Sequence, residues 1–334
     1  MPAGRMFQLD HIFDEDVLLF MVVAESRSFS KAAEIIGRNQ SSISKRIMEL
    51  EATLGVGLFD RAQRPVRMTP EGNVLYHNLK RHIGAISSML ERLKMANSLK
   101  PVLRLGCVES MSLDLLPEVM KRLIPETSQL SQVTATSNTQ LTLLLEHRLD
   151  IIITSDPYLN VKGLHRRLLF TEPSVILMSE AMAGSKSTPW TWPELQFCGK
   201  PFLNYTVESG GGRLNENYFT AQYIPLTNRI EVDSNSVMVS LIRDDVGWTL
   251  GRASTLVQTK KLSEGVVAVP MPEPIVTRDV WFLTRENEDL ILINRCYQII
   301  TEVLEQKVLP KLRQSAPWAA EYVKSGRYSE KKAD

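Results

Sequence analysis

Residues 39–55 read NQSSISKRIMELEATLG, and this stretch decides how the first part of the chain folds. Apolar side chains recur along it with the spacing of one helix face, at Ile43, Ile47, Leu50 and Leu54. Asn39 is a good N-cap for such a helix. We therefore expect a helix that begins after Asn39 and buries one apolar stripe.

The opposite face of this helix carries short hydroxyl, amide and cationic side chains, where an ordinary solvated helix would show more glutamate. Such groups hydrogen-bond to base edges and phosphates in the major groove of DNA. The candidate DNA contacts are Gln40, Ser41, Ser42, Ser44, Lys45 and Arg46.

The neighbouring segments fit a small helical domain. One helix should follow the acidic residues 14–16, and a second should span Ser30 to Ile36 and end at Gly37. Residues 58–69 read as two short strands around a Gln-Arg-Pro turn. This basic hairpin can lie along a phosphate backbone and would present Arg61, Arg64 and Arg67.

The composition fits a globular chain with a local basic excess. Of the 334 residues 43% are apolar, which is enough for two or three packed domains and excludes a fibrous or wholly disordered chain. The net charge of +1 offers no bulk attraction for nucleic acid or membrane. The first hundred residues, however, hold 14 Lys and Arg against 11 Asp and Glu.

The sequence predicts no metal centre, no cofactor and no enzyme. Cys107, Cys198 and Cys296 lie far apart and form no CxxC or Cys/His cluster, so we expect reduced thiols. The histidines form no HExxH motif, and no GxSxG elbow occurs. Without a signal peptide or a run of apolar residues long enough to span a bilayer, we expect a soluble cytoplasmic protein with no membrane partner.

A long helix should follow the hairpin, with Thr69 as N-cap and Pro70 at its first position, and should break between residues 97 and 101. Its apolar residues step by three and four, as in the seam of a coiled coil, at Tyr76, Leu79, Ile83, Ile86, Leu90 and Leu93. Two interpretations stay open from the spacing alone. The helix could lie on its own domain, or residues 76–93 could pair two copies of the chain.

The rest of the chain alternates strand-like and helical stretches. A strand at 102–108, a helix around 115–123 and an apolar strand at 150–154 predict parallel pairing. Further strands are expected at 168–170, 174–178, 202–205, 229–232, 266–269 and 280–283, with helices near 213–222 and 234–243. This order predicts an α/β body of two lobes.

Five short motifs recur together in one known family. They are Phe29-Ser30-Lys31-Ala32-Ala33, QSSISKRI at 40–47, Leu50-Glu51 with Leu54-Gly55, Leu58-Phe59-Asp60-Arg61, and Met68-Thr69-Pro70-Glu71-Gly72. With them the chain resembles the LysR-type transcriptional regulators from about Leu18 to about Pro310. The resemblance implies a sequence-specific regulator of transcription rather than an enzyme.

The resemblance also implies a domain plan. A winged helix-turn-helix domain would take residues 1–68, and a linker and dimerisation helix would take 69–98. A periplasmic-binding-protein-like effector-binding domain would take 99–315, with lobe I at about 99–170 and 276–315 and lobe II at about 171–275. We expect residues 316–334 to form a polar, partly disordered tail.

In this family a homodimer, and further a homotetramer, reads an inverted-repeat operator on double-stranded DNA. The present chain departs from the common pattern at Ser41, where many relatives have proline, and at Lys45, where arginine is commoner. Lysine keeps the positive charge but lacks the bidentate fork that reads guanine. Lys45 is therefore less suited than arginine to read guanine.

A small-molecule effector, with an anion among the candidates, would bind between the lobes, where strand ends meet helix N-termini. The positions that match effector contacts in the family are Ser110 after the first strand, Ser137 and Gln140 after the second, and Tyr205, Thr206 and Ser209 on the opposite lobe. The run at 210–212 lacks the GKS/T ending of a phosphate loop and reads as a flexible entry to a helix.

Two other functions compete with this interpretation. A thiol-based redox regulator could use Cys198, but no second cysteine lies nearby, and a buried structural thiol is the simpler reading. A solute-binding protein would share the body but would lack the basic head and would carry an export signal. Asp150 stands at the start of a strand, where a structural role is favoured over an acid catalyst.

Overall fold

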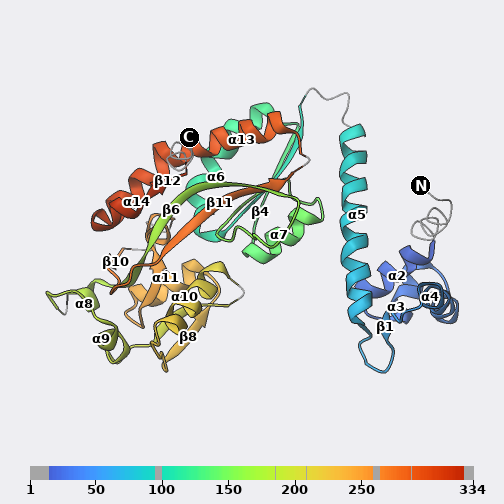
Figure 1. Ribbon diagram of the computed structural model, residues 1–334, viewed down its shortest axis with the longest axis horizontal. Helices are drawn as coiled ribbons and strands as arrows, with labels where there is room; N and C mark the ends of the chain where they lie inside the picture. The colour runs from blue at the N-terminus through green and yellow to red at the C-terminus, as the bar shows by residue number, and fades with distance from the viewer. Residues whose placement is uncertain are drawn as a thin grey trace. The chain divides into compact units, whose positions relative to one another are not determined.

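The computed structural model describes residues 15–94, 100–184, 186–207, 209–258, 264–286 and 288–326. The chain divides into two compact units, a head that extends to Ser87 and a body that begins at Ser88. The head is built from α2 (Glu15–Ser26), α3 (Phe29–Ile36), α4 (Gln40–Leu54), β1 (Phe59–Asp60), β2 (Arg67–Met68) and the first part of α5 (Pro70–Lys94) (Figure 1).

The helix expected to begin after Asn39 is present as α4. The Asn39 side chain accepts the Ser42 N–H at 2.9 Å, and Gly55 ends the helix in the left-handed conformation, so the predicted N-cap is confirmed. Ile43 and Ile47 are fully buried against α2 and α3, together with Phe20. The expectation for Leu54 is wrong: its side chain is exposed, because the last turn of α4 extends past the core of the head.

The predicted hairpin is present in a shorter form, with Phe59 opposite Met68. The hydroxyl of Thr69 accepts the N–H of Gly72 at 3.0 Å and donates to the carbonyl of Gly57 at 2.7 Å, so Thr69 caps α5 as predicted and also fixes the strand before it.

Helix α5 divides the expected seam into two parts. Its first turns pack Tyr76 and Leu79 into the core of the head, so this part of the seam covers the chain's own domain. Farther along, Ile83, Ile86 and Leu90 are exposed. The side chain of Leu93 lies outside the described residues.

One lobe of the body is a mixed sheet. Strands β3 (Val102–Cys107), β4 (Gln129–Thr134) and β5 (Ile151–Thr154) run parallel, and β11 (Thr277–Arg285) and β6 (Leu164–Ser179) continue the sheet antiparallel. Helices α6 (Glu109–Leu123), α13 (Leu290–Val303) and α14 (Leu309–Ser315) share one large apolar core with this sheet (Figure 1). Helix α7 (Ser137–Leu145) contributes to a second, smaller core.

The second lobe begins within β6. The strands expected at 168–170 and 174–178 are one continuous strand, whose first part pairs with β11 and whose second part pairs with β9 (Thr249–Arg252) and β10 (Val266–Val269). Strands β7 (Phe202–Tyr205) and β8 (Arg229–Val232) form a separate parallel pair. The helices of this lobe are α8 (Glu180–Ala183), α9 (Trp192–Gln196), α10 (Gly210–Ala221), α11 (Asn235–Arg243) and α12 (Ala253–Gln258).

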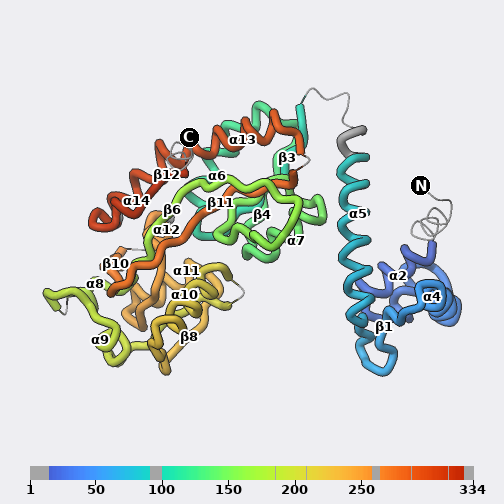
Figure 2. The backbone as a smooth tube through the Cα atoms, in the orientation of Figure 1, coloured from blue at the N-terminus to red at the C-terminus, as the bar shows by residue number. Residues whose placement is uncertain are grey.

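The C-terminal segment corrects another expectation. Residues 317–325 are not a solvated tail: a 3-10 helix (Pro317–Tyr322) leads into β12 (Lys324–Ser325), which pairs with β6 at Phe170 and Thr171 (Figure 2). Ala316, Ala319 and Val323 are buried in the core of the first lobe. Residues 316–323 are mostly apolar, and the polar average of the expected tail comes from the charged residues after Val323. The rest of the expected tail, 327–334, lies outside the described residues.

Candidate functional site

The surface of α4 presents its polar residues to solvent. Gln40, Ser41 and Lys45 are exposed, and the Lys45 ammonium lies 3.8 Å from Glu49 with 78% of its side chain accessible. Gln40 accepts a hydrogen bond from the Ser30 hydroxyl at 2.9 Å, and Ser41 donates to Asn39 at 3.1 Å. The first turn of α4 is thus ordered by short contacts that leave the surface open.

Two further candidate DNA contacts on α4, Arg46 and Ser44, are bonded to side chains of other elements of the head. Arg46 forms ion pairs with Glu15 at 2.6 Å and Asp16 at 2.5 Å, and the hydrogen bond to Glu15 raises the pKa of Arg46 above its ordinary value. The Ser44 hydroxyl accepts a hydrogen bond from Arg61 at 3.0 Å. In this structure Arg46 ties α4 to α2, and Ser44 ties α4 to the hairpin.

The hairpin, which we call the wing (residues 58–69), contains two kinds of arginine. Arg61 pairs with Glu51 at 2.8 Å and lies over the Phe29 ring at 5.3 Å, so it is part of the packing of the head. The side chains of Arg64 and Arg67 are exposed, and neither forms a hydrogen bond or ion pair with any residue that the structure describes. Together with Lys45, they are cations of the head that are open to a phosphate backbone.

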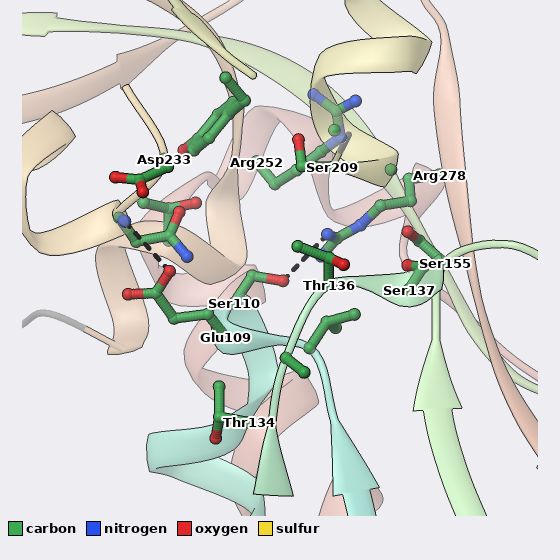
Figure 3. A pocket seen from close by; sticks show the side chains of 17 residues that line it. Glu109, Ser110, Thr134, Thr136, Ser137, Ser155, Ser209, Asp233, Arg252 and Arg278 are labelled. Carbon is green, nitrogen blue, oxygen red and sulfur yellow. Dashed lines mark hydrogen bonds between the residues drawn. The ribbon is translucent and has the colours of Figure 1, made fainter. Parts of the chain in front are cut away.

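A cavity of about 340 Å³ lies between the two lobes of the body (Figure 3). Four of the six expected effector contacts line it: Ser110, Ser137, Tyr205 and Ser209. Gln140 does not, because its buried amide donates to the carbonyl of Ala135 at 2.8 Å. Thr206 does not either, and its carbonyl instead accepts the N–H and the hydroxyl of Ser209.

The placement of Ser137 also needs correction. It follows β4, a strand that the sequence analysis did not predict, and not the apolar strand at 151–154. β4 lies at the edge of the sheet and has the polar sequence QLSQVT, so it lacks the continuous apolar run by which β5 is recognised.

The charged residues of the cavity were not predicted from the sequence. Arg278 on β11 donates to the carboxylate of Glu172 on β6, with 3.0 Å from its Nε atom, and to the Ser110 hydroxyl at 3.0 Å. Arg252, at the end of β9, also lines the cavity. The opposite part of the wall contains Glu109, Asp233 and Asn235. No spacing pattern could have found Glu172, Arg252 and Arg278, because only the pairing of distant strands brings them together.

Arg252 is the most unusual of these residues. Its side chain is buried, and its Nη1 atom donates to the carbonyl of Gly251 at 2.7 Å, while its Nε and Nη2 atoms have no hydrogen-bond partner in the described structure. Desolvation, and after it the nearby charge of Arg278, lowers the pKa of Arg252 to about 10. The guanidinium is therefore still charged at neutral pH.

The glycines at 210–212 lead into a helix as expected, but they are its first turn, since α10 begins at Gly210. Ser209 caps this helix, since its hydroxyl accepts the Gly212 N–H at 2.9 Å. A Cβ atom at Gly210 would overlap the Ser155 hydroxyl, and one at Gly212 would overlap the carbonyl of Thr206. Glycine is required here because another element approaches the helix start closely.

All three thiols are free in the structure. Cys198 is half-buried, and its thiol donates to the carbonyl of Leu195 at 3.1 Å. Cys107 and Cys296 are fully buried, and desolvation raises the pKa of both, that of Cys296 to about 12. This environment suits packing more than redox chemistry.

None of the helices within the described ranges has the length and apolar character needed to span a bilayer.

Buried ions elsewhere in the body are structural. Asp150 accepts hydrogen bonds from the Arg104 N–H at 2.9 Å and Nε at 3.1 Å and pairs with Arg285 at 3.3 Å. It joins the starts of neighbouring strands, in agreement with the structural role expected for it.

The head and the body each match a known protein family. Residues 15–73 match the family model described as a bacterial regulatory helix-turn-helix protein of the lysR family, and residues 96–305, more than half of the chain, match the LysR substrate binding domain. The HTH-type transcriptional regulator BenM of Acinetobacter baylyi is 35% identical over 101 residues, which cover 30% of this chain but only a third of BenM.

Other matches extend over most of the chain. The uncharacterised HTH-type regulator YfeR of Shigella flexneri is 25% identical over 276 residues, covering 81% of this chain and 87% of YfeR. Full-length CbnR, solved with its target DNA, has the same fold with a TM-score of 0.59 and 17% identity, covering 86% of this chain and 98% of that one. The chain belongs to the LysR family of transcriptional regulators, with a DNA-binding head and an effector-binding body.

Proposed function

We propose that the protein acts in the cytoplasm as a dimer that binds an inverted-repeat operator, with the exposed face of α4 against the major groove and the wing against the phosphates. The observation that carries this proposal is the contrast among the cations of the head. Arg46 and Arg61 are held by internal carboxylates, whereas Lys45, Arg64 and Arg67 are exposed, and the last two lack any described partner.

The exposed part of α5 supports the dimer. Ile83, Ile86 and Leu90 continue at coiled-coil spacing beyond the turns that pack on the head, and Met89 lies beside them on the surface. A second copy of α5 would remove these apolar side chains from water. A tetramer assembled from two such dimers rests on the family resemblance alone.

The DNA proposal is tested with a duplex that the wild-type protein enriches from a random library. We expect Lys45→Ala and Arg64→Ala each to lose about tenfold in affinity at about 0.1 M salt and to reduce the slope of log affinity against log salt by about 1, because each contacts one phosphate. Lys121→Ala, which removes an exposed cation of α6, is the matched control. Unchanged affinity of both head variants at matched salt would refute the assignment.

We further propose that the cavity between the lobes binds the effector and that this binding changes the affinity for the operator. Four hydroxyl-bearing family positions meet there with two buried arginines, so polar donors converge on one cavity. Native mass spectrometry of gently purified protein should detect a small molecule that leaves on denaturation. A Ser110→Ala variant that retains this molecule with unchanged affinity would remove Ser110 from the site.

A further inference from the structure

We infer that the effector is a dipolar molecule of amino-acid size, whose carboxylate pairs with Arg252 and whose cationic group faces Glu109 and Asp233. The inference rests on the proposed function in one respect, namely that the cavity between the lobes is the effector site. It goes further by assigning opposite charges to the two parts of the wall.

The positive part is defined by Arg252. Its relative exposure is 3%, and the two unpartnered atoms, Nε and Nη2, form one edge of the guanidinium plane. Two parallel N–H groups on one edge match the two oxygens of a carboxylate. Leaving such donors buried without partners is costly in the unliganded protein, so a carboxylate that displaces the groups now covering this edge gains that energy on binding.

The charge of the neighbouring arginine, Arg278, is already balanced inside the protein and does not require a ligand anion. Arg278 is neutralised by Glu172, which is itself fully buried, so these two residues contribute no net charge to the wall. The three buried ionic groups, Glu172, Arg252 and Arg278, therefore leave one uncompensated positive charge. A single carboxylate balances it.

Hydrogen-bond donors surround the same part of the cavity. Gly210 and Gly211 at the start of α10 line the wall, and the Ser155 and Ser137 hydroxyls lie close to Gly210. The amides of a helix N-terminus favour an anion. These amides would assist Arg252 in binding a carboxylate, but they do not define the site by themselves.

The negative part of the wall is formed by Glu109 and Asp233. In Figure 3 these two residues lie on one side of the cavity, and Arg252, Arg278 and Ser209 lie toward the other. Glu109 accepts the Asn235 N–H at 3.3 Å, a contact that joins the two lobes. A ligand with a second carboxylate at this end would meet like charge, whereas an ammonium or guanidinium group would be attracted.

The size of the cavity limits the ligand. A volume of about 340 Å³ lies at the lower end of the range for small-molecule sites. One amino-acid-sized molecule fits such a space.

The probes that test the proposal are the twenty L-amino acids, added one at a time to the full-length protein while its melting temperature is followed. For the amino acid with the largest stabilisation, the decarboxylated amine and the deaminated acid are then compared by calorimetry. We expect each analogue to bind at least about tenfold more weakly than the amino acid, because each lacks one of the two charged contacts. If no amino acid stabilises the protein, or if the deaminated acid binds equally well, the inference is wrong.

Two variants separate the ends of the ligand. Arg252→Gln should weaken binding of the amino acid and of its deaminated analogue alike. Asp233→Asn, at an exposed position that a stable fold does not need, should weaken binding of the amino acid and leave the affinity for the deaminated acid unchanged or higher. Equal affinity of the wild type and Asp233→Asn for the amino acid would exclude the cationic contact.

The same measurements distinguish this inference from the proposed function. If a simple carboxylate or a dicarboxylate binds, and Ser110→Ala or Arg252→Gln abolishes that binding, the effector cavity stands and the dipolar ligand does not. If the co-purifying molecule binds both variants with wild-type affinity, the cavity is not the effector site and both proposals fail.

Discussion

Glu51 of α4 and Arg61 of the wing form an ion pair with 2.8 Å between Oε2 and Nη2, and the other carboxylate oxygen of Glu51 accepts the N–H groups of Leu58 at 2.7 Å and Phe59 at 3.2 Å. One side chain therefore fixes the start of the wing to the helix that precedes it. The position of the wing arginines relative to α4 depends on this carboxylate.

Replacing Glu51 by alanine should loosen the wing. The variant loses three hydrogen bonds to a carboxylate that is only 15% exposed, and such charge-assisted bonds contribute about 1.5–3 kcal/mol each. We expect faster hydrogen exchange at Leu58 and Phe59 in mass spectrometry, together with weaker DNA binding. Glu49→Ala, on the same helix with 59% of its side chain exposed, should exchange like the wild type. Identical exchange in both variants would contradict the role assigned to Glu51.

Replacing Asp150 by asparagine should destabilise the body by about 3–5 kcal/mol, because it leaves the half-buried Arg104 and the buried Arg285 with one partner fewer. Urea denaturation followed by circular dichroism measures the loss. Glu118→Gln removes the surface partner of Lys121 and Lys307 and serves as the control, with no measurable change expected. A loss no larger for Asp150→Asn than for the control would show that the buried pair is dispensable.

Replacing Val323 by aspartate should also destabilise the body, by several kcal/mol, since it buries an unpaired charge in the core beneath the C-terminal segment. Thermal unfolding of the full-length protein is a suitable readout. Glu321→Ala changes an exposed residue two positions away and should leave the melting temperature unaltered. If Val323→Asp also left the melting temperature unaltered, residues 317–325 would contribute no packing to the core of the first lobe.

The thiols should react unequally with a disulfide reagent at pH 8. Burial raises the pKa of Cys296 to about 12 and raises that of Cys107 as well, so neither forms a thiolate at this pH in the folded protein. We expect at most one equivalent, from Cys198, before denaturation and three after it. Rapid release of two or more equivalents from the native protein would be the contrary result.

The same thiols give the stability a pH dependence. The pKa of Cys296 is higher in the folded chain than its ordinary value of 9.0, so the folded state keeps its proton where the unfolded chain has lost it. The contribution to stability is therefore complete below about pH 9 and falls as the pH rises toward 12. A Cys296→Ala variant should lose part of this alkaline decline.

The head could be predicted closely because its signals are local. The cap at Asn39, the stripe of Ile43 and Ile47 and the cap at Thr69 each depend on residues a few positions apart, and all are present in the structure. The burial predicted for Leu54 was wrong because periodicity does not reveal how far the core extends along a helix. The internal partners of Arg46 and Ser44 also lay beyond prediction, since they belong to other elements.

The body was less predictable where distant strands meet. β6 looked like two strands because Thr171, Glu172 and Pro173 resemble a break, yet the strand passes through them: Pro173 lies opposite Thr277, and the next residue, Ser174, donates its N–H to Val276. Glu172 is buried there because Arg278 neutralises it. A charged residue in the middle of a buried strand can be explained only once its partner is known.

The uninterrupted course of β6 places a buried ion pair in the strand that joins the two lobes. Glu172 stands beside the changeover from β11 to β9 pairing, and its partner Arg278, which lines the cavity, donates to the Ser110 hydroxyl. A molecule that displaced the Arg278 side chain would therefore disturb an ion pair of the connecting strand directly, with no other residue in between.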